Sequence, residues 1–298
     1  MFTQSPPGRA AVAAFAVLLA VETPAFSAAQ EPRITTGLKQ PESIAIGPRG
    51  QVYISETGEY EKANDGYISV LENGKTRPFA TGLDDPHGIK WWRDHLFVAD
   101  NMGIVWRIDA KGGAERFVDA TDFPRKITNF NDLEVDSSGN LYVSDSGDWE
   151  GRGGVIFRIT QEKKISVVIS DDDDWRLVSP NGLLMEDRNG LLVVDYTTGN
   201  LFRVDLRATP ATLEKIAGGF GAADGLARDA RGRLLITDYA GHRLFLLPLP
   251  VAQPPAKPTE MVVAGIESAA DLAISPDGKS LLIPDMGGGN LATLPMPR

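Results

Sequence analysis

Short apolar segments alternate with turn sequences along most of this chain of 298 residues. Six stretches repeat one order: a polar residue, a small or apolar pair, a short apolar strand, a turn, a second apolar strand and an acidic residue. The opening polar residues are Glu42, His87, Asn131, Asn181, Asp224 and Asp271. The closing acids are Glu56, Asp100, Asp145, Asp195, Asp238 and Asp285. Because the opening residues recur at intervals of 43 to 50 residues, the pattern predicts a fold of repeated β units.

Each repeat contains apolar segments for about four strands. The turns of the predicted hairpins combine Gly with Asp or Pro, as in Pro48–Gly50 and Asp136–Gly139, and these residues favour tight bends. Further apolar segments follow the hairpins, for example residues 67–71 and 77–80. Four strands in about 45 residues is typical of a propeller blade, and continuous helical periodicity is absent from the sequence. We therefore predict an all-β, six-bladed β-propeller.

The last repeat stops one strand short of four. Its strands are expected at residues 271–275, 280–284 and 291–295. At the other end of the chain, residues 32–38 resemble the outer-strand segments 77–83 and 259–265. We expect this N-terminal strand to complete the sixth blade, since a closed ring leaves only short, protected sheet edges.

The first 29 residues have the pattern of a secretory signal peptide. A twelve-residue apolar run, Ala10–Val21, follows Arg9, and small residues precede a cleavage site expected after Ala29. An apolar run of this length is too short to span a bilayer, which needs roughly 20 residues. We predict export to a bacterial periplasm or to the exterior. Residues 1–29 are then the signal peptide, and residues 30–298 form a single propeller domain.

Composition and charge narrow the classes of function. The chain contains no Cys, which excludes disulfides, thiol nucleophiles and zinc sites built on thiolates. It has 30 basic and 40 acidic residues and a formal net charge of −10, and an acidic surface repels phosphate backbones. We expect a monomer with no nucleic-acid partner and no membrane span in the mature chain.

The opening polar residues are the candidate functional set. The first strand of a propeller blade lines the central channel, so these side chains are expected to form a ring at one mouth of the channel. Three of them are carboxylates, and crowding without a cation would raise their pKa values. Carboxylate and carboxamide oxygens are hard ligands that favour Ca²⁺ over zinc or copper. The ring thus predicts a central cation, either Ca²⁺ or another divalent ion; the alternative is that these side chains satisfy one another or bind water.

Other acidic residues are expected to have supporting roles. Asp132 and Asp271 are expected to orient the side chains that bind the metal, without binding it directly. Asp271 could also contact the ion through a water molecule. The closing acids are expected to accept hydrogen bonds from the amides of the following turn, a structural role that is repeated in each blade.

The residues at the heads of four repeats carry a family resemblance. These residues are Pro41-Glu42, Asn131-Asp132, Pro180-Asn181-Gly182 and Asp224-Gly225. They resemble the SMP-30/gluconolactonase family of calcium-dependent propeller hydrolases, which is related more distantly to paraoxonases and diisopropylfluorophosphatase. The resemblance extends over nearly all of the mature chain and implies hydrolysis of a small-molecule lactone or ester. It implies that Asp224 is the general base or nucleophile, and that the catalytic metal is held by Glu42, Asn131, Asn181 and Asp224.

Two positions depart from these relatives. Pro86-His87-Gly88 is similar to a paraoxonase motif whose His belongs to a proton-shuttling dyad, but the partner position falls near Asn101. The dyad is therefore absent, and His87 either contacts substrate and shuttles a proton or is a structural His. Sugar-lactone members carry an Arg two residues before the first ligand Asn, where this chain has Asn129, which argues against gluconolactone as the substrate.

Long loops are expected on the face that carries the ring, where Trp149 and Trp175 would form an apolar wall.

Two other functions stay open. One is a non-catalytic periplasmic propeller that binds a ligand or protein partner and holds a structural ion. The other is a lyase similar to the streptogramin-opening enzymes, although those have seven blades and a His-based site. Fold alone does not decide among these functions.

Overall fold

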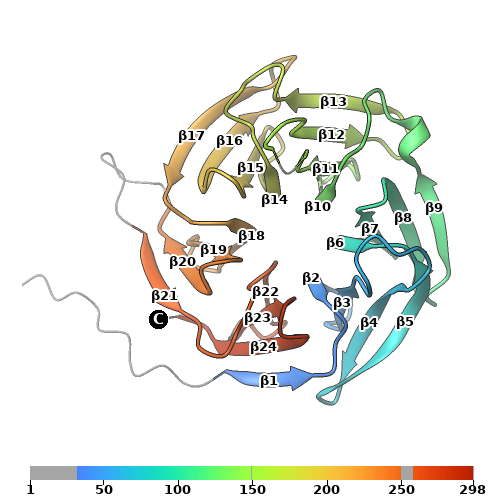
Figure 1. The fold of residues 1–298 in the computed structure, drawn as a ribbon, viewed down its shortest axis with the longest axis vertical. Helices are drawn as coiled ribbons and strands as arrows, with labels where there is room; N and C mark the ends of the chain where they lie inside the picture. The colour runs from blue at the N-terminus through green and yellow to red at the C-terminus, as the bar shows by residue number, and fades with distance from the viewer. Residues whose placement is uncertain (1–31, 149, 250–257, 298) are drawn as a thin grey trace, which may run out of the picture. The chain divides into compact units, whose positions relative to one another are not determined.

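Six four-stranded antiparallel sheets follow one another around a central space (Figure 1). The computed structural model describes residues 32–148, 150–249 and 258–297, so the predicted signal peptide and Trp149 lie outside the described residues. The sheets belong to the compact unit Gln30–Met296. The helical structure found in the described ranges is one 3-10 turn, η1 (Ala120–Asp122). The prediction of an all-β, six-bladed propeller is confirmed.

Blades 1 to 3 each run from an inner strand to an outer edge strand in chain order. Blade 1 contains β2 (Pro41–Ile46), β3 (Val52–Glu56), β4 (Gly66–Glu72) and β5 (Lys75–Leu83). Blade 2 contains β6 (Pro86–Trp92), β7 (His95–Asp100), β8 (Ile104–Asp109) and β9 (Ala114–Val118). Blade 3 contains β10 (Phe130–Val135), β11 (Leu141–Asp145), β12 (Val155–Ile159) and β13 (Ile165–Ser170).

Blades 4 and 5 have the same order, and blade 6 combines both ends of the unit. Blade 4 contains β14 (Pro180–Asp187), β15 (Gly190–Asp195), β16 (Asn200–Asp205) and β17 (Thr212–Gly218). Blade 5 contains β18 (Ala223–Arg228), β19 (Leu234–Asp238), β20 (Arg243–Leu247) and β21 (Thr259–Val262). Blade 6 contains β22 (Ala273–Ile274), β23 (Ser280–Asp285), β24 (Asn290–Pro295) and β1 (Arg33–Thr36). Strand β1 pairs antiparallel with β24, from Arg33 opposite Thr293 to Thr36 opposite Asn290.

The core lies between neighbouring blades. The second strands are buried along all of their length, as in β15, or all but the first residue, as in β7 and β23, because a neighbouring sheet covers each of their two faces. This explains why they are continuous apolar runs rather than alternating ones. Between blades 2 and 3, Phe123 packs edge-on against Phe130 and Phe157, with ring centroids 5.1 and 5.0 Å apart. No helix among the described residues is long and apolar enough to cross a membrane.

Each closing acid is the last residue of a second strand and ties two segments together. Asp145 accepts a hydrogen bond from the amide of Gly147 in the following turn, at 3.0 Å, as the sequence predicts. Glu56 differs from this prediction, because it accepts hydrogen bonds from the Tyr67 hydroxyl and from Ser69 Oγ in β4. Asp145 also accepts hydrogen bonds from the amides of Thr128 and Asn129, both at 2.9 Å. These two residues lead directly into the inner strand β10. The closing acid therefore fixes the segment that carries the opening polar residue, a role that the sequence analysis did not predict.

Candidate functional site

A β-bulge positions the opening polar residue in each of blades 1 to 5. In blade 1, Pro41 pairs with Glu56 and Ile44 pairs with Ile54. Two inner-strand residues, the first of them Glu42, therefore lie opposite one residue of β3. The same register shift occurs at the heads of β6, β10, β14 and β18. Since a bulge bends the strand and re-aims its side chains, it explains how a residue at the strand head comes to face the channel.

At the bulges, some backbone amides have no partner in the regular hydrogen-bond pattern of the sheet. Hydroxyl groups of the second strands accept hydrogen bonds from these amides. The three such bonds run from the Ser43 amide to Ser55 Oγ at 2.8 Å, from the Asp132 amide to Ser144 Oγ at 2.9 Å, and from the Gly225 amide to Thr237 Oγ1 at 2.7 Å. Because a buried amide without a partner costs free energy, these hydroxyls stabilise the bulges and with them the positions of the neighbouring opening residues.

Glycine follows the opening residue where two inner strands approach closely. A Cβ atom on Gly182 would lie 2.2 Å from the backbone oxygen of Asp224, and one on Gly225 would lie 2.6 Å from the Cα of Asp271. Neither glycine has a positive φ, so turn geometry does not explain them. Gly is required here because the next blade leaves no room for a side chain.

We predict that Gly182→Ala destabilises the fold by about 2 kcal/mol, within the range that overpacking costs. The new methyl group would push on the backbone that carries Asp224, so the head of β18 must shift. The loss is measured as the change in free energy of unfolding in urea. Gly113→Ala is the matched control, because there the Cβ would meet only the carboxylate of Asp109, which has room to move in its exposed turn. Equal losses in both variants would contradict the close-approach argument.

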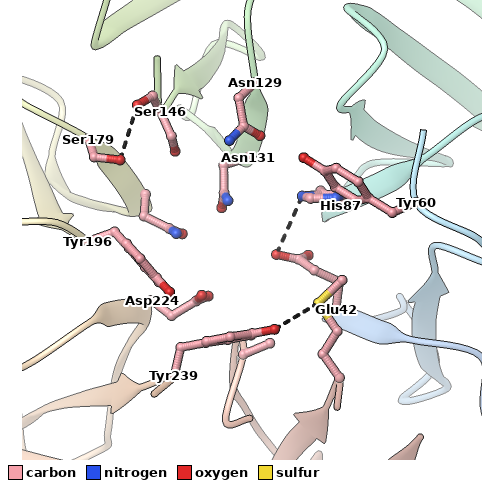
Figure 2. A pocket seen from close by; sticks show the side chains of 13 residues that line it. Glu42, Tyr60, His87, Asn129, Asn131, Ser146, Ser179, Tyr196, Asp224 and Tyr239 are labelled. Carbon is pink, nitrogen blue, oxygen red and sulfur yellow. Dashed lines mark hydrogen bonds and ion pairs between the residues drawn. The ribbon is translucent and has the colours of Figure 1, made fainter. Parts of the chain in front are cut away.

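Five of the six opening residues line one cavity of about 380 Å³. In Figure 2 Glu42, His87, Asn131 and Asp224 point toward a common central space, and Asn181 also lines the cavity. The structure thus brings together all four predicted metal ligands and the predicted His.

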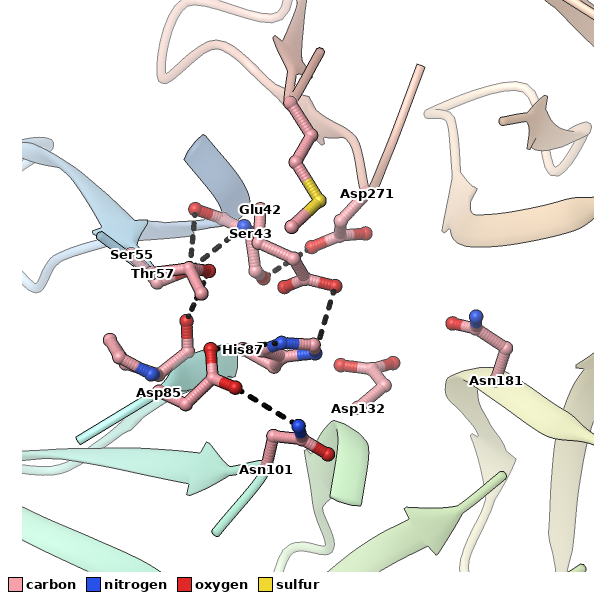
Figure 3. A network of polar contacts seen from close by, with 12 residues as sticks. Glu42, Ser43, Ser55, Thr57, Asp85, His87, Asn101, Asp132, Asn181 and Asp271 are labelled. Carbon is pink, nitrogen blue, oxygen red and sulfur yellow. Dashed lines mark hydrogen bonds and ion pairs between the residues drawn. The ribbon is translucent and has the colours of Figure 1, made fainter. Parts of the chain in front are cut away.

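Asp271, the sixth opening residue, does not line this cavity. Together with Asp132 it lines a second cavity of about 280 Å³. Strand β22 begins only at Ala273, after Asp271, and Asp271 Oδ2 accepts a hydrogen bond of 2.6 Å from Ser43 Oγ (Figure 3). Asp132 Oδ2 accepts a hydrogen bond of 2.6 Å from the amide of Leu183. Both carboxylates are therefore bound to inner strands of neighbouring blades, and their supporting roles toward the ligands stay predictions.

Two of the predicted ligands present buried oxygen atoms that accept no hydrogen bond from the described residues. Glu42 is 5% exposed and Asp224 is 6% exposed. Glu42 Oε2 and Asn131 Oδ1 have no hydrogen-bond partner among the described residues. None of the described residues lining this cavity is Lys or Arg. Since buried acceptors without partners are costly, these oxygens fit a hard divalent cation.

Burial raises the pKa values of both carboxylates well above their usual range. At Glu42, repulsion from Asp224 adds to the effect of burial. At Asp224, repulsion from Asp271 adds to it, and a hydrogen bond from Asn181 opposes it. A divalent cation between these carboxylates would relieve the repulsion and favour their charged forms.

A metal site built only from His, Cys, Asp and Glu side chains is not found in the described parts of the chain. No group of three or more His, Cys, Asp or Glu side chains there is arranged to hold a metal ion. The four predicted metal ligands are two carboxylates and two Asn carboxamides. Because Asn is not one of those four residue types, the predicted site is a different kind of metal site. An Asn oxygen coordinates an ion without adding charge, which leaves more of the ion's positive charge for a substrate.

His87 lies between two carboxylates. Its Nδ1 is 4.0 Å from Glu42 Oε1, and its Nε2 is 3.5 Å from Asp85 Oδ1. The other oxygen of Asp85 accepts a hydrogen bond from Asn101 Nδ2 at 3.0 Å (Figure 3). It also accepts one from the Glu61 amide at 3.2 Å. Burial acts to raise the pKa of Asp85, but the interactions with His87 and these hydrogen bonds hold it below its usual value. Asp85, rather than a second His, is the neighbour of His87, and the sequence analysis did not identify it.

A second set of lining residues was also missed. The residues that directly follow the closing acids are Thr57, Asn101, Ser146, Tyr196, Tyr239 and Met286. The last four of these line the cavity, together with Tyr60, Asn129 and Ser179 (Figure 2). The sequence repeat could have identified these lining residues. The second strand pairs antiparallel with the inner strand, so its end faces the same mouth of the channel as the head of the inner strand. Trp175, predicted as part of the wall, is 81% exposed and is not among the lining residues.

Comparison with known proteins supports the fold and the family. Residues 92–247 match the SMP-30/gluconolactonase/LRE-like region, which is more than half of the chain. A gluconolactonase from Xanthomonas campestris is similar with a TM-score of 0.69 and 17% identity, covering 89% of this chain and 90% of that one. Regucalcin from Agrobacterium tumefaciens, described as a calcium-binding protein, is similar with a TM-score of 0.65 and 18% identity, covering 87% and 90%.

A streptogramin B lyase is also similar, with a TM-score of 0.61 and 12% identity, covering 88% of this chain and 96% of that one. No curated protein sequence gives a significant match. At such low identities the structural likenesses support the fold alone, whereas the match over residues 92–247 identifies the family. The chain therefore belongs to the SMP-30/gluconolactonase/LRE-like family.

Proposed function

We propose that this protein is an exported, calcium-dependent hydrolase of small-molecule lactones or esters. The observation that carries the proposal is the convergence of Glu42, Asn131, Asn181 and Asp224 on one cavity. Glu42 Oε2 and Asn131 Oδ1 are buried without a hydrogen-bond partner among the described residues, and the lining residues described provide no basic side chain. Family membership supports a lactonase-type hydrolase.

These four side chains would hold the ion through their oxygens, one from each of four blades. A bound Ca²⁺ would supply Lewis-acid polarisation of a substrate carbonyl and charge stabilisation of the oxyanion. The bulges and the close packing at Gly182 hold the ligand oxygens in fixed positions. Hard oxygen donors of this kind select Ca²⁺ over softer metals.

Asp224 is also placed to act as the general base. Its carboxylate would take a proton from the attacking water as the new C–O bond forms, and the ester C–O bond then breaks. The departing alkoxide would take a proton from His87, which lines the same cavity and whose Nε2 is 3.5 Å from Asp85 Oδ1. Direct attack by the Asp224 carboxylate, with later hydrolysis of the acyl-enzyme, is the alternative course.

Export and a monomeric state are part of this proposal. The export prediction rests on the signal-peptide pattern of residues 1–29. Without Cys, an exported chain has no disulfides to stabilise it, so a bound cation would add stability that the fold lacks.

The test is a panel of lactones and aryl esters with the purified mature protein in Ca²⁺. We expect turnover of at least one substrate, and a loss of about a hundredfold or more after metal is removed by a chelator, since Lewis-acid stabilisation of the transition state contributes several kcal/mol. Re-addition of Ca²⁺ should restore the rate.

Failure to turn over any member of the panel at saturating Ca²⁺ would favour the non-catalytic alternative. In that case the cavity would bind a ligand or partner, and the ion would be structural. Turnover that survives complete metal removal would instead reject the calcium-dependent mechanism.

A further inference from the structure

A fully buried carboxylate lies beside His87, behind the wall of the cavity. Asp85 directly precedes β6 and is 0% exposed, and it is not among the residues that line the cavity. Its amide donates to Asp100 Oδ1 at 3.1 Å, and its backbone oxygen accepts from the Asn101 amide at 2.8 Å. These two bonds fix its backbone at the head of blade 2. Because a buried charge is costly unless it is paired, Asp85 requires a partner such as the neighbouring imidazole.

The two oxygens of the Asp85 carboxylate have different surroundings. Oδ2 accepts hydrogen bonds from Asn101 Nδ2 and from the Glu61 amide. Oδ1 has no hydrogen-bond partner among the described residues and lies 3.5 Å from His87 Nε2. Hydrogen bonds between catalytic groups are often long in ligand-free structures and shorten in the complex. Oδ1 is therefore the acceptor that is left for a proton on Nε2.

The other nitrogen of the His87 ring is directed toward the metal ligands. Nδ1 lies 4.0 Å from Glu42 Oε1, on the opposite side of the ring from Asp85 (Figure 3). His87 and Glu42 both line the cavity. The hydrogen bond that one imidazole nitrogen makes decides which nitrogen carries the proton of the neutral ring. The geometry thus places Nε2 behind the cavity wall and leaves Nδ1 on the side of the cavity.

The loop between β3 and β4 covers this pair of residues. The Glu61 amide in the loop donates to Asp85 Oδ2 at 3.2 Å. The preceding residue, Tyr60, lines the cavity, and its ring centroid is 6.5 Å from that of His87. His87 is only 5% exposed as a result. Asp85 therefore contacts both the imidazole and the loop that shields it from water.

We propose, on the basis of the proposed function, that Asp85 is a positioning residue for proton transfer by His87. By accepting a hydrogen bond from Nε2, it fixes the ring and leaves Nδ1 as the nitrogen that exchanges protons in the cavity. As the ester C–O bond breaks, the Nδ1 proton passes to the departing alkoxide oxygen, and the ring keeps its proton on Nε2. Asp224 then releases the proton taken from the attacking water, and Nδ1 takes one up, so the protein returns to its initial state.

Asp85→Asn is expected to reverse the positions of the ring protons. Two amide donors, from Asn101 and Glu61, face the same oxygen of residue 85, so the oxygen of the new carboxamide would remain there. Its NH2 group would then face His87 Nε2, which must become an acceptor. The charged ring has protons on both nitrogens and would place two donors against each other. The form that gives up the Nδ1 proton is therefore disfavoured in this variant.

The kinetic test compares two substrates at saturating Ca²⁺. Hydrolysis of δ-valerolactone expels an alkoxide, which must gain a proton, whereas 4-nitrophenyl acetate expels a nitrophenolate that is stable without one. We expect Asp85→Asn to lower kcat for δ-valerolactone about a hundredfold, at the low end of what positioned proton transfer contributes. The kcat for 4-nitrophenyl acetate should remain nearly unchanged. A packing defect would lower both rates alike and would overturn the inference.

Asp84→Asn is the matched control, because it makes the same chemical change in the neighbouring residue. Asp84 Oδ1 accepts a hydrogen bond from the Asn64 amide of the same loop at 3.0 Å, and its other oxygen lies 3.7 Å from Arg116 Nη2. Asp84 thus helps to hold the loop but is directed toward Arg116 rather than His87. The ratio of the two kcat values should not change in this variant. An equal change of the ratio in both variants would mean that the loop, and not the imidazole, is responsible.

Nitrogen-15 NMR of the imidazole rings tests the inference without turnover. The chain has three His, and His87→Gln assigns the His87 signals by their loss. Nε2 of His87 should carry a proton in the unmodified protein and lose it in Asp85→Asn, whereas His95, beside Asp94 at the surface, should not change.

A proton-free Nε2 in the unmodified protein would overturn the inference, as would a proton that stays on Nε2 in a folded Asp85→Asn variant. If that variant does not fold, the spectrum of the unmodified protein decides. If no substrate is hydrolysed, the proposed function fails, while the spectra still decide whether Asp85 positions His87.

Discussion

Asp224→Asn is expected to lower kcat/KM for a lactone substrate by about a thousandfold at saturating Ca²⁺, within the range for loss of a general base. The amide keeps an oxygen at the ligand position but has no carboxylate to take a proton from water or to attack the carbonyl. Initial rates with the best substrate of the panel, measured for both proteins at several Ca²⁺ concentrations, give the comparison. The cation should still raise the melting midpoint of the variant, although by less, because one of the two ligand charges is lost.

Asp277→Asn is the control for the same chemical change. Asp277 lies in an exposed turn, where it accepts hydrogen bonds from Ser275 and Lys279, and it is not among the residues lining the cavity.

Activity of Asp224→Asn within tenfold of the unmodified protein would show that Asp224 serves only as a ligand. A complete loss of Ca²⁺ stabilisation in that variant would make the activity result uninformative about the base. Asn131→Ala, which removes a ligand oxygen but no carboxylate, then decides: if it keeps a measurable rate, Asp224 is more than a ligand.

The repeat in the sequence was sufficient to predict the architecture. The opening residues and the closing acids recur in register along the sequence, and the 12 or 13 residues between them leave room for one hairpin. The position of a residue within the repeat then predicts which end of the channel it faces. For this reason the opening residues could be placed at one mouth of the channel without coordinates, and five of the six line one cavity. The choice of Glu42, Asn131, Asn181 and Asp224 as metal ligands came from the family resemblance.

The sequence was less informative where function depends on contacts between blades. Within blade 2, Asp85 was missed as the neighbour of His87, because the sequence pattern does not show how the bulge at the head of β6 aims the His87 ring. The sequence analysis did not predict that Gly182 packs closely against the backbone of the next blade. Asp271 has the register of an opening residue, but β22 begins too late to present it in the same way. The packing at Gly182 and the position of Asp271 depend on how neighbouring inner strands lie against each other, which a repeat pattern does not contain.

Removal of Ca²⁺ is expected to lower the melting midpoint by about 5–10 °C at pH 8 and by much less at pH 5. A ligand at about a hundred times its Kd stabilises by about 2.7 kcal/mol, and each kcal/mol shifts the midpoint of a domain this large by about 2–4 °C. The folded-state pKa values of Glu42 and Asp224 are raised, whereas unfolded carboxyl groups titrate near pH 4. Between these values the folded, metal-free protein binds more protons than the unfolded chain, so its stability falls as the pH rises through this window. Since Ca²⁺ requires the charged carboxylates, its own stabilisation grows as the pH rises.

Glu42→Gln tests whether Ca²⁺ stabilises the protein by neutralising the buried carboxylates rather than by a general effect on packing. The variant removes one of two mutually repelling buried charges, so at pH 8 the metal-free midpoint should rise while the Ca²⁺-induced shift becomes smaller. A packing defect would instead lower the midpoint in both conditions. Calorimetric scans of metal-free and Ca²⁺-saturated protein at pH 5 and pH 8 measure all of these quantities. An equal Ca²⁺ shift at the two pH values would mean that the ion binds away from Glu42 and Asp224, and a lower metal-free midpoint in Glu42→Gln would mean that the Glu42 carboxylate stabilises the fold through another partner.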